Sequence, residues 1–176
     1  MKRSAATLTL AALCAGTALA QSDVPPATPS ARAAERAVVA YVVQDSVAEV
    51  QIARLAAGKT SNEAVRAFAQ RMIQDHSAAA QQGVTLGKQI GAADARMKPS
   101  DEGPIELQHL SRYSGKQFDD EYLKGSVKSH EHDIETVRDA LEGSSNPDVV
   151  QFERTVLAQM EDHLRLAHRS LDALAR

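Results

Sequence analysis

Apolar residues recur three and four positions apart along most of this chain, a spacing that places them on one face of an α-helix. The pattern predicts four long helices, over about 32–57, 60–90, 114–142 and from 146 onward, and a short one over about 104–113. No segment alternates polar and apolar residues as a half-buried strand does. The predicted fold class is therefore all-α: an antiparallel four-helix bundle, with the short helix bridging helices two and three.

Capping residues predict where these helices begin and end. Gly58 is the expected stop of the first helix, because glycine favours the conformation that ends a helix. Thr60–Glu63 and Ser114–Gln117 have the spacing of capping boxes, in which the first and last side chains bond free backbone amides. Asn146 is the expected cap of the fourth helix, with Pro147 in its first turn, where proline is tolerated.

Four polar side chains interrupt the apolar faces, one on each long helix: Glu49, His76, His130 and His163. A polar group buried without a partner is costly, so we expect these four to meet one another inside the protein. Three imidazoles and a carboxylate from separate helices could bind one transition metal ion: zinc, iron, manganese or copper. The same residues could instead form a metal-free hydrogen-bond network that aligns the helices, and the sequence leaves both interpretations open.

Other charged and imidazole side chains are expected outside this interior site. Asp75 lies about 100° around the helix from His76, so capping or surface pairing is the favoured expectation there, and support for the edge of the site is the alternative. The charged run over 131–139, which includes Asp133, predicts a solvated face. Three further histidines lie off the apolar faces and are interpreted as surface or boundary residues: His109, His132 and His168.

The first 20 residues have the pattern of an export signal. Lys2 and Arg3 form a basic start, an apolar run over 5–18 follows, and residues 18–20 (Ala-Leu-Ala) form a small-x-small cleavage site. We predict cleavage after Ala20 and a periplasmic location, with association with the outer membrane left open. The apolar run is shorter than the ~20 residues that a membrane-spanning helix needs.

Composition limits what the exported chain can do. After the signal, 21–31 is a Pro-rich segment expected to be a disordered tether, and 32–176 is expected to be one bundle domain. The processed chain would hold 156 residues with a formal charge of −5 and no tryptophan, which argues against nucleic-acid binding. The only cysteine, Cys14, leaves with the signal, so neither a disulfide nor thiol chemistry is expected. No later segment is apolar enough to predict a membrane span.

Several short stretches together resemble an exported bacterial family known as domain of unknown function 4142. The stretches that carry the resemblance are Ala48–Val50, Val65–His76, Phe118–Asp119 with Tyr122, His130, and Phe152–His163. The resemblance covers about 38–174 and implies a ferritin-like four-helix bundle, but little chemistry. Di-iron ferritin-like proteins carry Glu three residues before the metal-binding histidine on two helices. Here those positions hold Ile73, Val127 and Met160, so a single metal ion, or none, is expected.

These observations favour a protein that is not an enzyme. The leading interpretation is a periplasmic helical bundle whose buried Glu/His cluster binds one transition metal, for metal handling or for protection against envelope stress. One alternative is a metal-dependent redox enzyme that acts on peroxide or superoxide. Another is a metal-free interaction module of the cell envelope, whose partner could be an envelope protein or a second copy of this chain. The sequence contains no Gly-flanked serine of the kind that carries out nucleophilic hydrolysis. It also contains no glycine-rich loop for binding phosphate.

Overall fold

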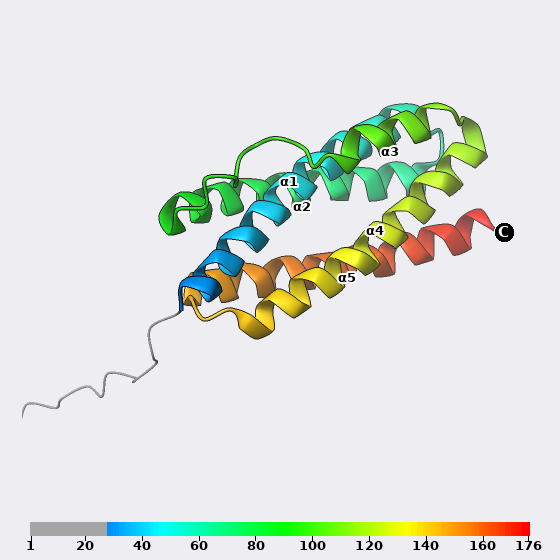
Figure 1. Ribbon diagram of the computed structural model, residues 1–176. Helices are drawn as coiled ribbons and strands as arrows, with labels where there is room; N and C mark the ends of the chain where they lie inside the picture. The colour runs from blue at the N-terminus through cyan, green and yellow to red at the C-terminus, as the bar shows by residue number, and fades with distance from the viewer. Residues whose placement is uncertain (1–27) are drawn as a thin grey trace, which may run out of the picture.

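The computed structural model describes residues 28–176, which form five α-helices (Figure 1). These are α1 (Pro29–Lys59), α2 (Glu63–Ile90), α3 (Glu102–Ser111), α4 (Gly115–Gly143) and α5 (Pro147–Leu174). No strand is present among residues 28–176, so the all-α prediction is confirmed. The predicted export signal, its cleavage after Ala20 and segment 21–27 of the tether lie outside the described residues.

The first helix begins three residues earlier than the sequence predicted. Pro29 opens α1, and the hydroxyl of Thr28 accepts a hydrogen bond from the backbone amide of Ala31 at 3.1 Å. Proline interrupts a helix in its interior but suits the first turn, where its missing N–H costs nothing. Residues 29–31, which the sequence assigned to the tether, are therefore helical.

The cap of α2 differs from the predicted capping box. Asn62 occupies the cap position, and its Oδ1 accepts hydrogen bonds from two amides of the first turn at 2.9 and 3.2 Å. Thr60 ends the preceding helix instead, since its amide donates to the carbonyl of Ala56 at 2.9 Å. The expected stop at Gly58 is also wrong, because α1 continues through Gly58 to Lys59.

The two later caps give one correction and one confirmation. Ser114 precedes α4 as expected, but its side chain makes no capping hydrogen bond, so the second capping box is not formed. Asn146 caps α5 as predicted, and its Oδ1 accepts hydrogen bonds from the amides of Asp148 at 2.9 Å and Val149 at 3.4 Å. Pro147 lies in the first turn of α5, as the sequence indicated.

The long helices pack in two pairs, α1 along α2 and α4 along α5 (Figure 1). Helix α2 also contacts α5, and α1 contacts both α3 and α4. The connection between α2 and α3 runs back along α1, where the amide of Ser100 donates to the carbonyl of Gln44 at 2.9 Å. This connection places α3 beside the C-terminal half of α1.

A layer of polar side chains separates two apolar clusters in the interior. The first cluster includes Val43, Ala79, Ile134 and Met160. The second includes Ile52, Met72, Leu123 and Ala167. On each long helix, a buried polar residue lies between a member of one cluster and a member of the other: Ser46 and Glu49, His76, His130, and His163. The sequence pattern thus positions all of these polar groups near the middle of the helices.

Candidate metal centre

The three histidines predicted for the site meet in this polar layer. His76 from α2, His130 from α4 and His163 from α5 are buried, with exposed fractions of 3%, 1% and 1%. One ring nitrogen of each lies within 4.8 Å of those of the other two. The ring centroids are 5.2 to 5.6 Å apart. Because each histidine replaces a core residue on the inner face of its helix, the three rings are directed to the same interior region.

Glu49 is buried in the same layer, but it is not a member of this group. Its Oε1 accepts a hydrogen bond from the hydroxyl of Ser129 at 2.8 Å. The residue of α1 that reaches the histidines is Ser46, whose Oγ lies 3.3 Å from Nδ1 of His76. Positions three apart share a helix face but differ by most of a turn in height. Helix α1 therefore presents a hydroxyl to the histidines, and its carboxylate lies further along the helix.

Each histidine uses one ring nitrogen to contact the protein around it. Nε2 of His163 lies 2.9 Å from Oδ2 of Asp75, a buried carboxylate that also pairs with Arg71. Nδ1 of His130 lies 2.8 Å from the carbonyl oxygen of Ser126. Partners of this kind fix the orientation and tautomer of an imidazole that binds a metal through its other nitrogen.

These contacts determine where the protons of two imidazoles lie. A carbonyl oxygen only accepts hydrogen bonds, so Nδ1 of His130 carries a proton and Nε2 of His130 carries a lone pair. The carboxylate of Asp75 likewise requires a proton on Nε2 of His163, which leaves a lone pair on Nδ1. The two lone-pair nitrogens, His130 Nε2 and His163 Nδ1, face each other at 3.3 Å. Two neutral imidazoles in these tautomers cannot hydrogen-bond to each other across this gap.

A proton between the rings is disfavoured. Burial lowers the pKa of all three histidines below the ordinary value of 6.5. For His76, the neighbouring imidazoles of His130 and His163 lower the pKa further. The hydrogen bond to Asp75 acts in the opposite direction on the pKa of His163 but does not outweigh burial. In addition, Nε2 of His76 is buried with no hydrogen-bond partner among the described residues.

A small cavity adjoins two of the three rings, those of His76 and His163. Its volume is about 10 Å³, and it is lined by residues of α1, α2 and α5 that include Ser46, His76, Met160 and His163. A void of this size is at the lower limit of what holds one water molecule. The cavity therefore has room for at most one small ligand beside these two rings.

Asp75 is an interior partner of the site, which the sequence predicted only as the less favoured alternative. It was expected in a cap or surface pair, yet it is 8% exposed and contacts His163. The expectation considered only the face of α2 that carries His76. Helix α5 packs beside α2, so the position one residue before His76 faces another helix and not solvent. Nothing in the pattern of α2 alone gives that information.

Asp133 also departs from the expected solvated face. Its side chain is 3% exposed, and its Oδ1 accepts a hydrogen bond from the hydroxyl of Tyr41 on α1. Burial raises the pKa of Asp133 to about 6, although the hydrogen bond from Tyr41 opposes this change. Asp133 follows His130 by three residues, a spacing that places two side chains on the same helix face. That spacing was a signal in the sequence that could have identified it.

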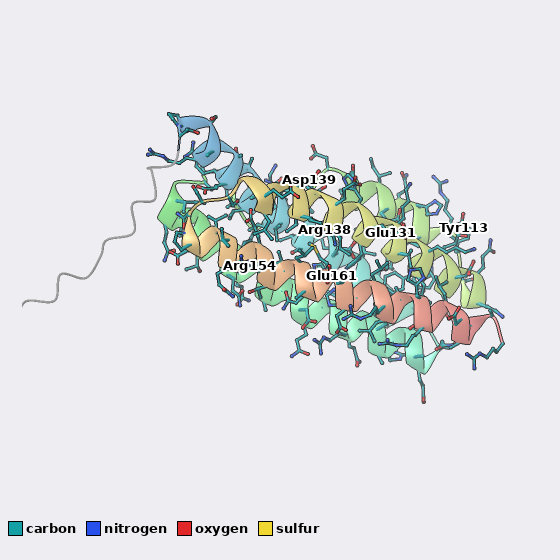
Figure 2. All side chains as sticks on the ribbon, turned by 90° about the horizontal axis from the view of Figure 1, so that it is seen from below. Tyr113, Glu131, Arg138, Asp139, Arg154 and Glu161 are labelled. Atoms are coloured by element: carbon teal, nitrogen blue, oxygen red, sulfur yellow. The ribbon has the colours of Figure 1, made fainter. Side chains whose placement is uncertain are left out.

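The other charges of this run lie at the surface, as expected. Figure 2 labels three of them on α4: Glu131, Arg138 and Asp139. Arg138 pairs with Glu161 of α5 at 3.1 Å, an exposed contact between neighbouring helices. The surface or boundary positions predicted for the other three histidines are also confirmed. His132 and His168 are exposed, and His109 is a boundary residue whose Nε2 lies 3.3 Å from Oε2 of Glu121.

The structure is therefore that of an all-helical protein with a buried centre of three histidines. The chain belongs to the family described as "Domain of unknown function (DUF4142)", whose model matches residues 20–169. The resemblance predicted from the sequence is confirmed at this level. No curated protein and no solved structure matches the chain. Since the family description assigns no activity, function has to be argued from the site.

Among residues 28–176, no helix combines the length and the apolar character that crossing a membrane requires.

Proposed function

We propose that this protein binds one transition metal ion through His76, His130 and His163. The observation that carries the proposal is the pair of nitrogens 3.3 Å apart, His130 Nε2 and His163 Nδ1, which direct lone pairs toward each other. A cation between them replaces this repulsion with two coordinate bonds. Nε2 of His76, buried without a hydrogen-bond partner, supplies a third lone pair.

The spacing of the nitrogens supports this proposal. Nitrogens bound to a tetrahedral zinc ion at ~2.0–2.1 Å lie about 3.3–3.4 Å from one another. The 3.3 Å separation between His130 and His163 matches that value. The nitrogen of His76 lies within 4.8 Å of the other two, within reach of a side-chain adjustment. The partners Asp75, Ser126 and Ser46 contact the opposite side of each ring, as the surroundings of metal-binding histidines do.

The donor atoms favour certain metals. Imidazole nitrogen suits zinc, copper and iron, whereas manganese prefers oxygen ligands, and the group of three contains no carboxylate. One ion is proposed because residues 28–176 contain a single group of closely gathered ligand atoms. The adjoining cavity of about 10 Å³ is at the lower limit for one water molecule, and peroxide and superoxide are larger than water, which favours holding an ion over their turnover.

The setting of this site is also part of the proposal. The basic start and the cleavage site before Gln21 support export to the periplasm, where the protein would take part in metal handling or in protection against envelope stress. Short connections between α1 and α2 and between α4 and α5 support an antiparallel four-helix bundle, similar to ferritin-like bundles. N-terminal sequencing of the protein from a periplasmic fraction tests the export proposal, and Gln21 is the expected first residue.

Metal titration tests the binding proposal directly. Zinc, added to metal-free protein in competition with a chromophoric chelator, is expected to bind at one equivalent. His163→Ala is expected to abolish this binding, since it removes one of the two facing nitrogens. His168→Ala is the matched control, because His168 lies on the same helix but is exposed. Equal zinc binding by the two variants, or none by the parent protein, would show that the histidines form only a polar network.

A further inference from the structure

A second cavity, much larger than the one beside the histidines, lies between α1, α3 and α4. Its volume is about 660 Å³, within the ~300–1,000 Å³ typical of small-molecule sites. Apolar side chains form part of its wall: Ala48 and Ile52 from α1, and Ile105 from α3. Ser126 and Ser129 of α4 line it as well, so the side of α4 near His130 contributes to its boundary.

Carboxyl groups dominate the polar part of this wall. Six of them line the cavity: Asp45, Glu49, Asp101, Glu102, Glu106 and Asp133. None of the six takes part in a salt bridge within the part of the chain that the structure describes. Lys128 and His132 also line the cavity, but both are exposed, at its outer edge. The interior of the cavity therefore gathers carboxyl groups without a matching cation from the described residues.

Several polar atoms in this wall have no partner. Oε2 of Glu49, Oδ2 of Asp45 and Oδ2 of Asp133 are buried and accept no hydrogen bond from the described residues. The hydroxyl of Tyr122, on a side chain only 1% exposed, has no partner either. Buried polar atoms are rarely left unsatisfied, so this concentration in one cavity points to a bound group that donates hydrogen bonds.

Unpaired carboxylates in such a wall are costly to ionise. Burial raises the pKa of Glu49 to about 7 and that of Asp133 to about 6. The pKa of Asp45 is raised too, by burial first and then by the charges of Asp133, Glu49 and Glu102. A cationic ligand would relieve the repulsion between these groups.

The arrangement of the acids favours an organic cation over a metal ion. The histidines are the only residues among 28–176 whose ligand atoms gather closely enough to hold one ion. The carboxyl groups instead surround a space that is far larger than an ion. A primary amine can reach separate carboxylates through hydrogen bonds, and its carbon chain can contact the apolar wall.

We propose that this cavity binds a small aliphatic amine. Its ammonium group contacts Glu49, Asp45 and Asp133, and its carbon chain lies against Ile52 and Ile105. This site is separate from the proposed metal centre and does not depend on it, since Glu49 is not a member of the histidine group.

Calorimetric titration of the full exported chain with 1,4-diaminobutane tests the proposal. Saturable binding of the diamine at one equivalent is expected, with no binding of 1,4-butanediol, a neutral molecule of similar shape. Glu49→Gln and Asp45→Asn are each expected to weaken diamine binding about tenfold or more, because each removes a charged acceptor. Glu131→Gln, an exposed position on α4, is the matched control and is expected to bind normally.

The outcomes separate the two proposals. Zinc binding by the histidines is expected to persist in Glu49→Gln, and diamine binding is expected to persist in His163→Ala. Equal heats for the diamine and the diol, or unchanged diamine binding in both acid variants, would overturn the amine site. Magnesium binding that Glu49→Gln abolishes, without diamine binding, would overturn it in favour of a metal site. Circular dichroism checks folding, and Glu102→Gln, at an exposed position of the cavity wall, supplies a less disruptive variant expected to weaken diamine binding.

Discussion

Asparagine at position 75 is the most informative change at the candidate metal centre. In the parent protein the carboxylate of Asp75 accepts the Nε2 proton of His163 at 2.9 Å, which leaves the lone pair of Nδ1 directed at His130. An asparagine amide has nearly the same shape but can also donate a hydrogen bond. Asp75→Asn therefore permits the other tautomer of His163, in which a proton occupies Nδ1 and blocks the metal ligand.

The structure gives a magnitude for this effect. Loss of a partner that orients a metal-binding histidine costs typically about 10–100-fold in affinity, or about 1.4–2.7 kcal/mol. Asp75 is 8% exposed and His163 is 1% exposed, so water replaces little of the lost interaction. We therefore expect zinc affinity to fall toward the upper end of that range, while the stoichiometry stays at one equivalent.

Competition with a chromophoric chelator measures the change in zinc affinity. Asp162→Asn is the matched control, because Asp162 directly precedes His163 and pairs with Arg165, at 3.0 Å, on the surface. Its zinc affinity is expected to equal that of the parent protein. An Asp75→Asn variant that folds and binds zinc as tightly as the parent would refute the tautomer argument.

Three further results are expected. Because burial raises the pKa of Glu49 from 4.5 to about 7, the folded protein binds more protons than the unfolded chain between those values, and stability falls as the pH rises through 7. Urea unfolding should therefore show that Glu49→Gln stabilises the metal-free protein above pH 7, by up to about 3 kcal/mol, and has little effect below pH 4.5. Gly83→Ala should destabilise by about 1–3 kcal/mol, since its Cβ would lie 2.5 Å from Cγ2 of Val43. Gly58→Ala should stabilise by up to ~1 kcal/mol, because a Cβ at position 58 would have no atom within 4 Å. Thermal unfolding in which Gly83→Ala has a higher Tm than Gly58→Ala would contradict this account of the packing. Zinc at about 100 times its Kd should add about 2.7 kcal/mol of stability, measured as a rise in Tm that is absent in His163→Ala.

The sequence was sufficient to predict the helices and the three histidines of the site. Helix periodicity depends on local spacing, so the inner face of each helix can be assigned without knowledge of its neighbours. His76, His130 and His163 occupy positions of that inner face, and their convergence follows once the helices pack. The ends of the helices were less accurate, because Asn62 and Thr60 are both suitable caps and the path of the chain between α1 and α2 decides which one is used.

The other contacts of the site depend on how far each helix is displaced along its axis relative to its neighbours. Glu49 and Ser46 occupy the same face of α1, and only the packing of α1 against α2 brings Ser46 beside His76. Asp75 is similar, since its burial results from the position of α5. Periodicity gives the direction of a side chain around a helix but not its height relative to another helix, so the sequence could not identify these partners.

The three nitrogen ligands come from only three of the four long helices, so a bound ion would not stabilise the four helices equally. Helices α2, α4 and α5 each supply an imidazole, while α1 supplies only the hydroxyl of Ser46. An ion at the centre would cross-link those three helices and hold α1 only indirectly. Backbone amides of the cross-linked helices would then gain the most protection from solvent exchange, and those of α1 would gain less.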